Sequence, residues 1–305
     1  MDGFLNLYKL PDWTSHDCVA KVRRILQTKK VGHGGTLDPA AVGVLPIAIG
    51  KATRLLQYLP EGKAYRAIIR LGIQTTTDDL EGEVVYSEPV QDLTIEHIQA
   101  VIPQFIGKII QTPPIYSAIK VDGQRLYKLA RSGETSETVA VPTREVQIDQ
   151  IEILKWTPGD FPEVEVQITC GGGTYIRSIA RDLGTRLGTK GVLVRLERNA
   201  SCGFQLANSI TLEELERQQQ SGIFMPVSPN LGLAHLPAIT LTDESLVKCW
   251  SQGRRLAVDT LTITPSIDLN SIGYARVVFE DCCLGIGEIQ QTNLGHELVP
   301  QTVLI

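Results

Sequence analysis

The chain has 305 residues, of which 43% are hydrophobic and 21% charged, and this composition excludes a disordered protein. No apolar run reaches the ~20 residues of a membrane-spanning helix, and the N-terminus lacks the features of a secretory signal, so we expect a cytoplasmic protein. The net charge of −5 argues weakly against a nucleic-acid ligand, but residues 1–60 carry eight Lys or Arg against four Asp or Glu, and local charge decides where a polyanion binds.

The first predicted element is a helix that starts with Ser15 as N-cap and runs to about Gln27. Its basic residues belong to a cluster that reaches the next loop: Lys21, Arg23, Arg24, Lys29 and Lys30. From charge alone, a solvated helix face is the simpler interpretation of this cluster. A glycine-rich loop follows, and then an apolar stretch over residues 42–59 that Pro46 and Gly50 interrupt.

The middle of the chain predicts an antiparallel sheet with helices. Residues 65–72 have the pattern of a strand, and residues 84–86 are expected to pair with it across a polar turn. A helix is expected over residues 94–105, interrupted near Pro103. Alternation predicts half-buried strands over residues 146–154 and 164–169, and helical spacing predicts a helix over residues 175–187.

The end of the chain predicts a separate small domain. Thr211 and Glu214 have the form of a capping box that opens a helix, and Pro226, Pro229 and Pro237 indicate a linker. Beyond the linker, residues 275–279 and 284–289 are β-type runs. We therefore expect two domains, one over residues 1–230 and a small β-domain over residues 235–305.

The most unusual motif is VGHGGTLDPAAVGVLP, which spans residues 31–46. Three glycines in four residues, followed by Asp38 and Pro39, form a loop that can approach a ligand closely and hold one carboxylate rigidly. A phosphate-binding P-loop is excluded because no GK[ST] follows, and a dinucleotide fingerprint lacks its spacing. From the residues alone, a tight turn with Asp38 as a cap explains the loop equally well.

This motif resembles the catalytic motif of the TruB family of pseudouridine synthases. The family's other motifs follow in order as KLPDWTSHD, KAYRAIIRLG, QTPPIYSAIKVDGQRLYKLAR, GGGTYIRSIARDLGTRLG and LVRLERNASCGF, over roughly residues 4–210. The resemblance implies the α+β pseudouridine synthase fold, a mixed and mainly antiparallel sheet flanked by helices. It also implies a PUA-like RNA-binding β-domain at residues 235–305.

The implied activity is the isomerisation of uridine 55 in the T-loop of tRNA, without a cofactor. By resemblance, Asp38 is the catalytic carboxylate, and Arg177 of TYIR pairs with it and keeps it ionised. The residues do not decide whether Asp38 adds covalently to the sugar or base or removes the C2′ proton. The target base must flip out of the folded loop to reach Asp38.

The resemblance also implies residues that contact the flipped base or the RNA. Tyr65 stacks on the base, Tyr175 lies against it and assists proton transfer at C5, and Leu196 lines the same pocket, although packing in the core explains Leu196 as well. His33, which would otherwise be a candidate general base, is expected to contact RNA. Lys120 is expected to contact the RNA backbone or to support the active-site loop.

Further features set limits on this interpretation. Lys9 matches a family lysine with a structural role, but Leu10 and Asp12 of KLPDWTS replace the Pro and Gly of the family turn, so its geometry is in question. Gly34 stands where Thr is common, which predicts a looser loop. The six cysteines lack metal-ligand spacing, so we expect free thiols and no zinc.

Two alternatives to a stand-alone, monomeric tRNA enzyme remain open. In the first alternative, the chain is the catalytic subunit of a guide-RNA complex. In the second, it is an RNA-binding or RNA-folding protein whose catalysis is incidental or lost. A short chain without lysine-rich tails favours the stand-alone enzyme, and the presence of Asp38, Tyr65, Tyr175 and Arg177 argues against lost catalysis. We expect tRNA to be the partner, with neither a membrane nor an obligatory protein partner.

Overall fold

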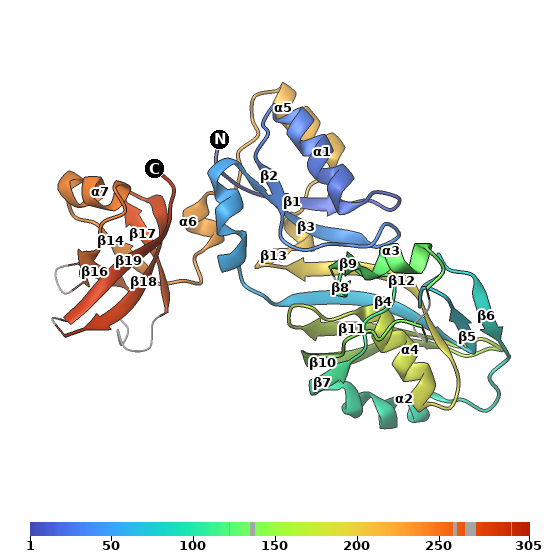
Figure 1. Cartoon of the computed structure of the whole chain (residues 1–305). Helices are drawn as coiled ribbons and strands as arrows, with labels where there is room; N and C mark the ends of the chain where they lie inside the picture. The colour runs from blue at the N-terminus through green and yellow to red at the C-terminus, as the bar shows by residue number, and fades with distance from the viewer. Residues whose placement is uncertain (122, 135–137, 259–260, 266–272, 294) are drawn as a thin grey trace.

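The computed structural model describes residues 1–121, 123–134, 138–258, 261–265, 273–293 and 295–305. Two β-sheets dominate the structure, a large one near the N-terminus and a smaller one at the C-terminal end, joined through a short helix (Figure 1). No helix in these ranges is long and apolar enough to span a membrane.

The large sheet has nine strands, and seven of them lie side by side in the order β1-β3-β12-β4-β11-β10-β7, while β2 pairs with β3 and β13 with β12. The strands are β1 (Gly3–Lys9), β2 (Val31–His33), β3 (Val42–Ile49), β4 (Lys63–Leu71), β7 (Gly107–Gln111), β10 (Arg144–Thr157), β11 (Glu163–Cys170), β12 (Gly191–Ser201) and β13 (Phe204–Gln205). The pairing is antiparallel except between β3 and β12. The predicted mixed, mainly antiparallel sheet with helices is thus confirmed.

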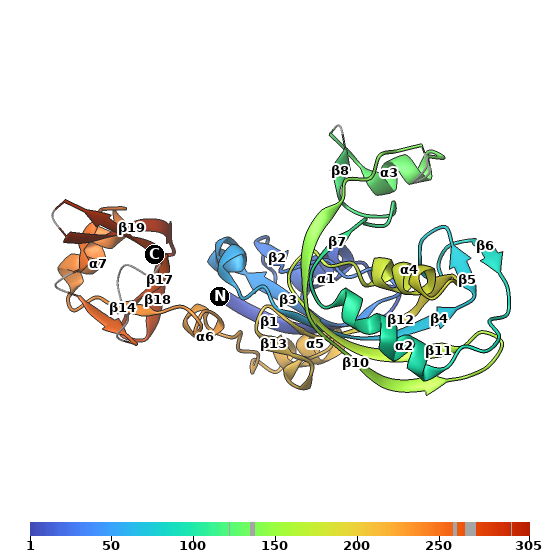
Figure 2. The ribbon, with the colours of Figure 1, turned by 90° about the horizontal axis from the view of Figure 1, so that it is seen from below.

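Most helices pack around this sheet and add residues to its core, while the helix at residues 126–131 projects from it (Figures 1 and 2). They are α1 (Ser15–Ile25), α2 (Ile95–Val101), α3 (Leu126–Arg131), α4 (Ile176–Arg186) and α5 (Leu212–Gln220), with the 3-10 segments η1 (Gly50–Tyr58), η2 (Ile102–Phe105) and η3 (Leu206–Asn208). Helix α4 buries Ile176, Ile179 and Leu183, which recur at helical spacing. It lies so close to β12 that a side chain on Gly184 would meet the backbone of Gly191 at 2.3 Å.

Two local predictions are wrong. The N-cap of α1 is Thr14, one residue before the predicted Ser15, because Thr14 and Asp17 form a reciprocal capping box. Residues 84–86 lie in β6 (Val84–Ser87), which pairs with β5 (Ile73–Thr75) and not with β4. Gly72 has a φ of +85° between β4 and β5, so the chain bends there and the second hairpin leaves the main sheet.

The C-terminal sheet has six strands in the order β15-β19-β18-β17-β14-β16 and carries one helix, α7 (Glu244–Ser251). The strands are β14 (Ala238–Thr240), β15 (Leu256–Ala257), β16 (Thr262–Thr264), β17 (Tyr274–Phe279), β18 (Cys282–Thr292) and β19 (Gly295–Val303). The predicted β-type runs fall in β17 and β18. The proline-rich linker contains α6 (Pro229–Gly232).

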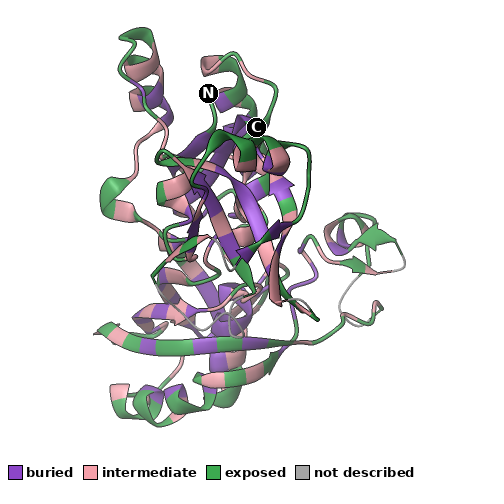
Figure 3. Ribbon diagram, turned by 90° about the vertical axis from the view of Figure 1, so that its left-hand side faces the viewer, coloured by how far each residue is buried: buried purple, intermediate pink, exposed green. Residues whose placement is uncertain are grey.

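The two sheets have separate cores and a packed junction. Trp250 is fully buried in the C-terminal core, and its indole N–H donates to the Leu284 carbonyl at 3.1 Å. A third buried cluster joins Leu55 of η1 and Phe4 of β1 to Ile286 of β18. Buried residues gather on the central strands, while helices, loops and the outer strands, such as the long β10, also carry exposed residues (Figure 3).

The parallel contact between β3 and β12 positions the motif loop. Glu197 and Arg198 of β12 stand opposite Val42 and Gly43 of β3, immediately after the loop that contains Asp38. Gly43 has a φ of +106°, and a Cβ there would lie 2.4 Å from the Arg198 carbonyl oxygen. Only glycine allows the two strands to approach this closely.

We predict that Gly43→Ala destabilises the protein more than Gly107→Ala does. Gly107 also has a positive φ, +93°, but nothing lies within 4 Å of its Cβ position. Gly107→Ala is therefore the control, because it measures only the cost of placing a side chain on a residue with positive φ. The expected difference in the free energy of unfolding is roughly 1–3 kcal/mol, measured by urea denaturation. Equal losses would contradict the close approach of β3 and β12.

Candidate functional site

The loop between β2 and β3 carries Asp38 at the edge of the large sheet. Strand β2 ends at His33 and β3 starts at Val42, and the Ala41 amide donates to the Asp38 carbonyl at 3.1 Å, which closes a turn around Pro39. This turn lifts the Asp38 carboxylate away from the sheet, and 38% of its side chain is exposed.

Asp38 rests on a buried guanidinium. Arg177 Nε lies 3.0 Å from Asp38 Oδ2, and only 6% of the Arg177 side chain is exposed. The same guanidinium donates to the carbonyls of Thr77 at 3.1 Å and Tyr116 at 3.0 Å. Backbone carbonyls therefore hold Arg177 in place, while Asp38 keeps an exposed face.

Asp79 is a second carboxylate at this guanidinium, and the sequence analysis did not identify it. Its Oδ2 lies 3.6 Å from Arg177 Nε, while its Oδ1 accepts hydrogen bonds from the Thr77 hydroxyl at 2.5 Å and from the Glu81 amide at 3.0 Å. The segment TTTDDLEG indicated only a polar turn. The sequence carried no signal that this turn folds onto Arg177, beyond the two adjacent acidic residues themselves.

The backbone of the loop is held by two buried cations. Lys9 is 1% exposed, and its ammonium donates to the carbonyls of Leu10, Trp13 and Pro39 at 2.8–2.9 Å. Arg198 is fully buried and donates to the carbonyls of Gly35 at 3.0 Å, Thr36 at 3.2 Å and Val44 at 2.7 Å. These bonds hold the loop on both sides of Asp38.

Hydrogen bonds hold the backbone at both departures from the family motif. Asp12 adopts a left-handed φ of +67°, which aspartate tolerates better than most residues, and its amide donates to the Pro39 carbonyl at 3.1 Å. Gly34 donates to the Pro46 carbonyl at 2.8 Å and accepts from the Cys202 thiol at 3.3 Å. Hydrogen bonds therefore hold both backbone groups of Gly34, although its residue type predicts a looser loop.

The two tyrosines predicted to contact the base lie on different elements. Tyr65 is buried in β4, directly opposite Arg198 of β12. Burial raises the pKa of the Tyr65 hydroxyl, and the charge and a hydrogen bond of Arg198 oppose that increase. Tyr175 is the N-cap of α4, two residues before Arg177, and its backbone makes two hydrogen bonds with the Gln111 side chain at 2.8 and 3.0 Å.

His33 and Leu196 occupy different environments. His33 Nδ1 accepts a hydrogen bond from the Gly35 amide at 3.3 Å, and its ring meets the His16 ring edge-on at 5.5 Å. Burial, followed by the nearby His16 and Arg198, lowers the pKa of His33 and favours a neutral ring. Leu196 is half-buried in β12 and packs against the main core.

Lys120 is the predicted residue that the structure leaves apart from the others. It starts the hairpin of β8 (Lys120–Val121) and β9 (Gln124–Arg125), where its side chain is exposed. Apart from Asp122, which lies outside the described residues, this segment and α3 project from the sheet (Figure 2). The residues that lead into this projecting segment reach the site, because Arg177 donates a hydrogen bond to the Tyr116 carbonyl.

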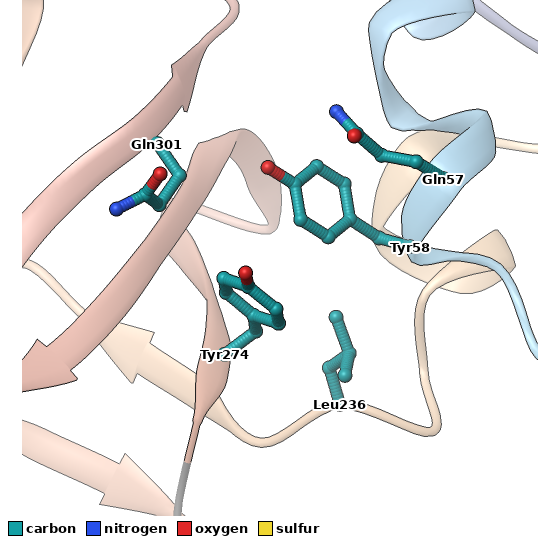
Figure 4. Close-up of a pocket in the computed structure, with 5 residues that line it drawn as sticks. All are labelled: Gln57, Tyr58, Leu236, Tyr274 and Gln301. Atoms are coloured by element: carbon teal, nitrogen blue, oxygen red, sulfur yellow. The ribbon is translucent and has the colours of Figure 1, made fainter.

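A cavity of about 430 Å³ lies elsewhere, at the junction of the two sheets. Gln57 and Tyr58 of η1 face Tyr274 and Gln301 of the C-terminal sheet across it, with Leu236 at its edge (Figure 4). The Tyr58 and Tyr274 rings meet edge-on at 5.2 Å. None of the predicted site residues lines it. In the described ranges, no three His, Cys, Asp or Glu side chains cluster to hold a metal ion.

Comparison with known proteins gives concordant matches. The family model "TruB family pseudouridylate synthase (N terminal domain)" matches residues 23–176. The chain is 52% identical to tRNA pseudouridine synthase B of Nostoc sp. (strain PCC 7120), covering 99% of this chain and 98% of that protein. It is 53% identical to the enzyme of the same name from Microcystis aeruginosa, covering 100% and 99%.

Solved structures agree with the sequence relatives. A chain from the crystal structure of a Cbf5-Nop10-Gar1 complex superposes with a TM-score of 0.74 and 28% identity, covering 99% of this chain and 85% of that one. A chain from an H/ACA RNP bound to a substrate RNA containing 2′-deoxyuridine gives a TM-score of 0.72 and 27% identity, with 99% and 85% coverage. The fold is therefore that of the pseudouridine synthases, and the chain belongs to the TruB family of pseudouridylate synthases.

Proposed function

We propose that this chain isomerises uridine 55 in the T-loop of tRNA to pseudouridine. One observation carries the proposal: an accessible carboxylate, Asp38, rests on the buried guanidinium of Arg177 inside the family motif. Relatives at about half identity over nearly their full length bear the name tRNA pseudouridine synthase B, which supports tRNA as the substrate.

The proposed role of Asp38 is to start the detachment of the base. The bond from ribose C1′ to uracil N1 breaks with its electron pair going to the base, the base turns, and C5 forms the new bond to C1′. A base then removes the C5 proton, and N1, which is no longer bonded to C1′, takes up one proton, so that the product is an isomer of the substrate. The Asp38 carboxylate serves this chemistry by adding to the sugar or base, or by removing the C2′ proton, and its ion pair with Arg177 holds it in position.

The base enters the site by flipping out of the folded loop, at a cost of a few kcal/mol. Tyr65 is proposed to stack on the flipped base, since β4 presents its ring on the face that Arg198 shares. Tyr175 is assigned to proton transfer at C5, and Leu196 to the apolar wall of the pocket. Because its lowered pKa favours a neutral ring, His33 is proposed to contact the RNA through its ring and not through an ion pair.

The remaining assignments concern RNA binding and assembly. Residues 1–230 are proposed to form the catalytic domain and residues 235–305 a PUA-like RNA-binding domain. Lys120, exposed on the projecting hairpin, suits a contact with the RNA backbone. We propose a cytoplasmic monomer that needs no cofactor. We also propose that it needs no protein partner, because the relatives with about half identity are named for tRNA, whereas the less similar Cbf5 chain comes from a multiprotein complex.

The purified chain, assayed on an unmodified T-arm stem-loop, is expected to convert one uridine to pseudouridine, as read by mapping the modified nucleotide. Activity without added protein or guide RNA supports a stand-alone enzyme. Conversion only after guide RNA and partner proteins are added would contradict the stand-alone assignment. Binding without conversion under either condition would point to an RNA-folding protein.

Replacing Asp38→Asn should lower single-turnover conversion by at least about 10³-fold, because the amide can neither attack nor remove a proton. RNA affinity should stay within about threefold, since phosphate contacts supply most of the binding energy. Asp160→Asn, the same change at an exposed position, is the control and should keep both properties. Normal turnover in Asp38→Asn would remove the catalytic assignment.

Asp79→Asn tests whether the second carboxylate orients Arg177. We expect a fall in turnover of about tenfold or more with little change in KM, because Arg177 loses a neighbour that fixes its orientation and Asp38 shifts with it. Asp182→Asn is the matched control, since Asp182 pairs with Arg181 on the same helix. Equal effects of the two substitutions would show that Asp79 has no specific role.

A further inference from the structure

Lys63 is a cation beside the catalytic loop to which the proposed chemistry assigns no role. It begins β4, two residues before Tyr65, so the two side chains leave the same face of the strand about 7 Å apart. Its ammonium lies 3.7 Å from the position that a Cβ would occupy on Gly35, in the loop that leads to Asp38.

A second cation stands close to it. Arg198 Nη1 also lies 3.7 Å from that Gly35 position, so the two nitrogens are at most twice that distance, 7.4 Å, apart. Arg198 is held by three carbonyls, as described above. Lys63 differs, because within the described part of the chain no hydrogen bond or ion pair of its ammonium is found, and its side chain is half-buried and not sealed from solvent.

This arrangement has a cost for the folded protein. Burial first, and then the charge of Arg198, lower the pKa of Lys63, so its protonated form is less favourable in the folded chain than in the unfolded one. A residue needed only for packing would not have to be cationic here. An accessible, unpartnered ammonium beside a fixed guanidinium is instead suited to an incoming anion.

The permanent anion of an RNA substrate is the phosphodiester. Because Lys63 and Tyr65 lie on the same face of β4 about 7 Å apart, a nucleotide whose base stacks on Tyr65 can place one of its adjoining phosphates at Lys63. The guanidinium of Arg198, already bonded to the loop, adds positive potential without having to move.

We propose that Lys63 binds a phosphate that adjoins the flipped uridine, next to the fixed charge of Arg198. This inference rests on the proposed function, because it takes the bound uridine at Tyr65 as given. It assigns Lys63 to substrate binding and not to bond breaking.

Lys63→Gln tests the proposal by affinity. The Kd for the T-arm stem-loop should rise about tenfold, and the slope of log K against log salt should shrink by about 0.7 to 0.9, the value of one phosphate contact. The single-turnover rate constant at saturating RNA should stay within about threefold. Lys63→Arg should recover most of the affinity, whereas Lys155→Gln, which removes the same charge from an exposed site on β10, should change nothing.

The contact itself is tested with neutral linkages in the RNA. A methylphosphonate is placed on the 5′ or the 3′ side of the target uridine, and one of the two should weaken wild-type binding as much as Lys63→Gln does. On that RNA the substitution should cost nothing more. The proposal would be overturned if the losses from Lys63→Gln and from the methylphosphonate added up at both linkages. A slower rate constant with unchanged Kd in Lys63→Gln would also overturn it, because Lys63 would then act on the departing uracil.

Thermal unfolding separates binding from a structural role. Lys63→Gln removes the repulsion with Arg198, so its Tm should equal or exceed that of the wild type, and a clear fall would contradict the proposal.

Wild-type conversion of the all-phosphate stem-loop is measured in parallel. Its absence would count against the proposed function, while normal conversion with unchanged Lys63→Gln affinity would count against this inference alone.

Discussion

The pairing of Asp38 with Arg177 is the interaction on which the rest of the site depends. A guanidinium buried without partners is unfavourable, and a carboxylate that is to act on a substrate needs a fixed position with one face open. The structure meets both needs by burying Arg177 against backbone carbonyls and leaving one face of Asp38 open. The sheet, helix α4 and the motif loop all serve to bring these two side chains together.

The loop illustrates how a fold positions a reactive group through its backbone. Lys9 and Arg198 come from strands that are distant in sequence, yet both end on carbonyls that flank Asp38. Because carbonyl oxygens carry only partial charge, they satisfy these cations without neutralising them. Two positive charges are therefore fixed on the loop beside Asp38, even though the whole chain carries a net charge of −5.

Three neighbouring strands of the large sheet, β4, β11 and β10, followed from the strand patterns in the sequence, and α4 followed from helical spacing, because one buried face dictates each pattern. The strands β1, β3, β7 and β12 were not predicted, since continuous apolar runs and motif segments there lack a clear alternation. The Asp38–Arg177 contact followed from the family motif and not from periodicity. Asp79 was missed because its role depends on a turn folding back onto α4, a tertiary contact that local sequence does not encode. The pairing of β6 with β5 was missed for a similar reason, since the bend at Gly72 redirects a hairpin whose residues fit either partner.

Gly34 and Cys202 show how two distant positions become interdependent. A side chain at 34 would place its first carbon 3.2 Å from the Cys202 sulfur and 3.3 Å from Pro46, tighter than ordinary contact. A larger residue at one position therefore requires a smaller one at the other. In a set of related sequences these two sites should vary as a pair, so that exchanging a single residue between family members would strain the loop while exchanging both would leave it intact.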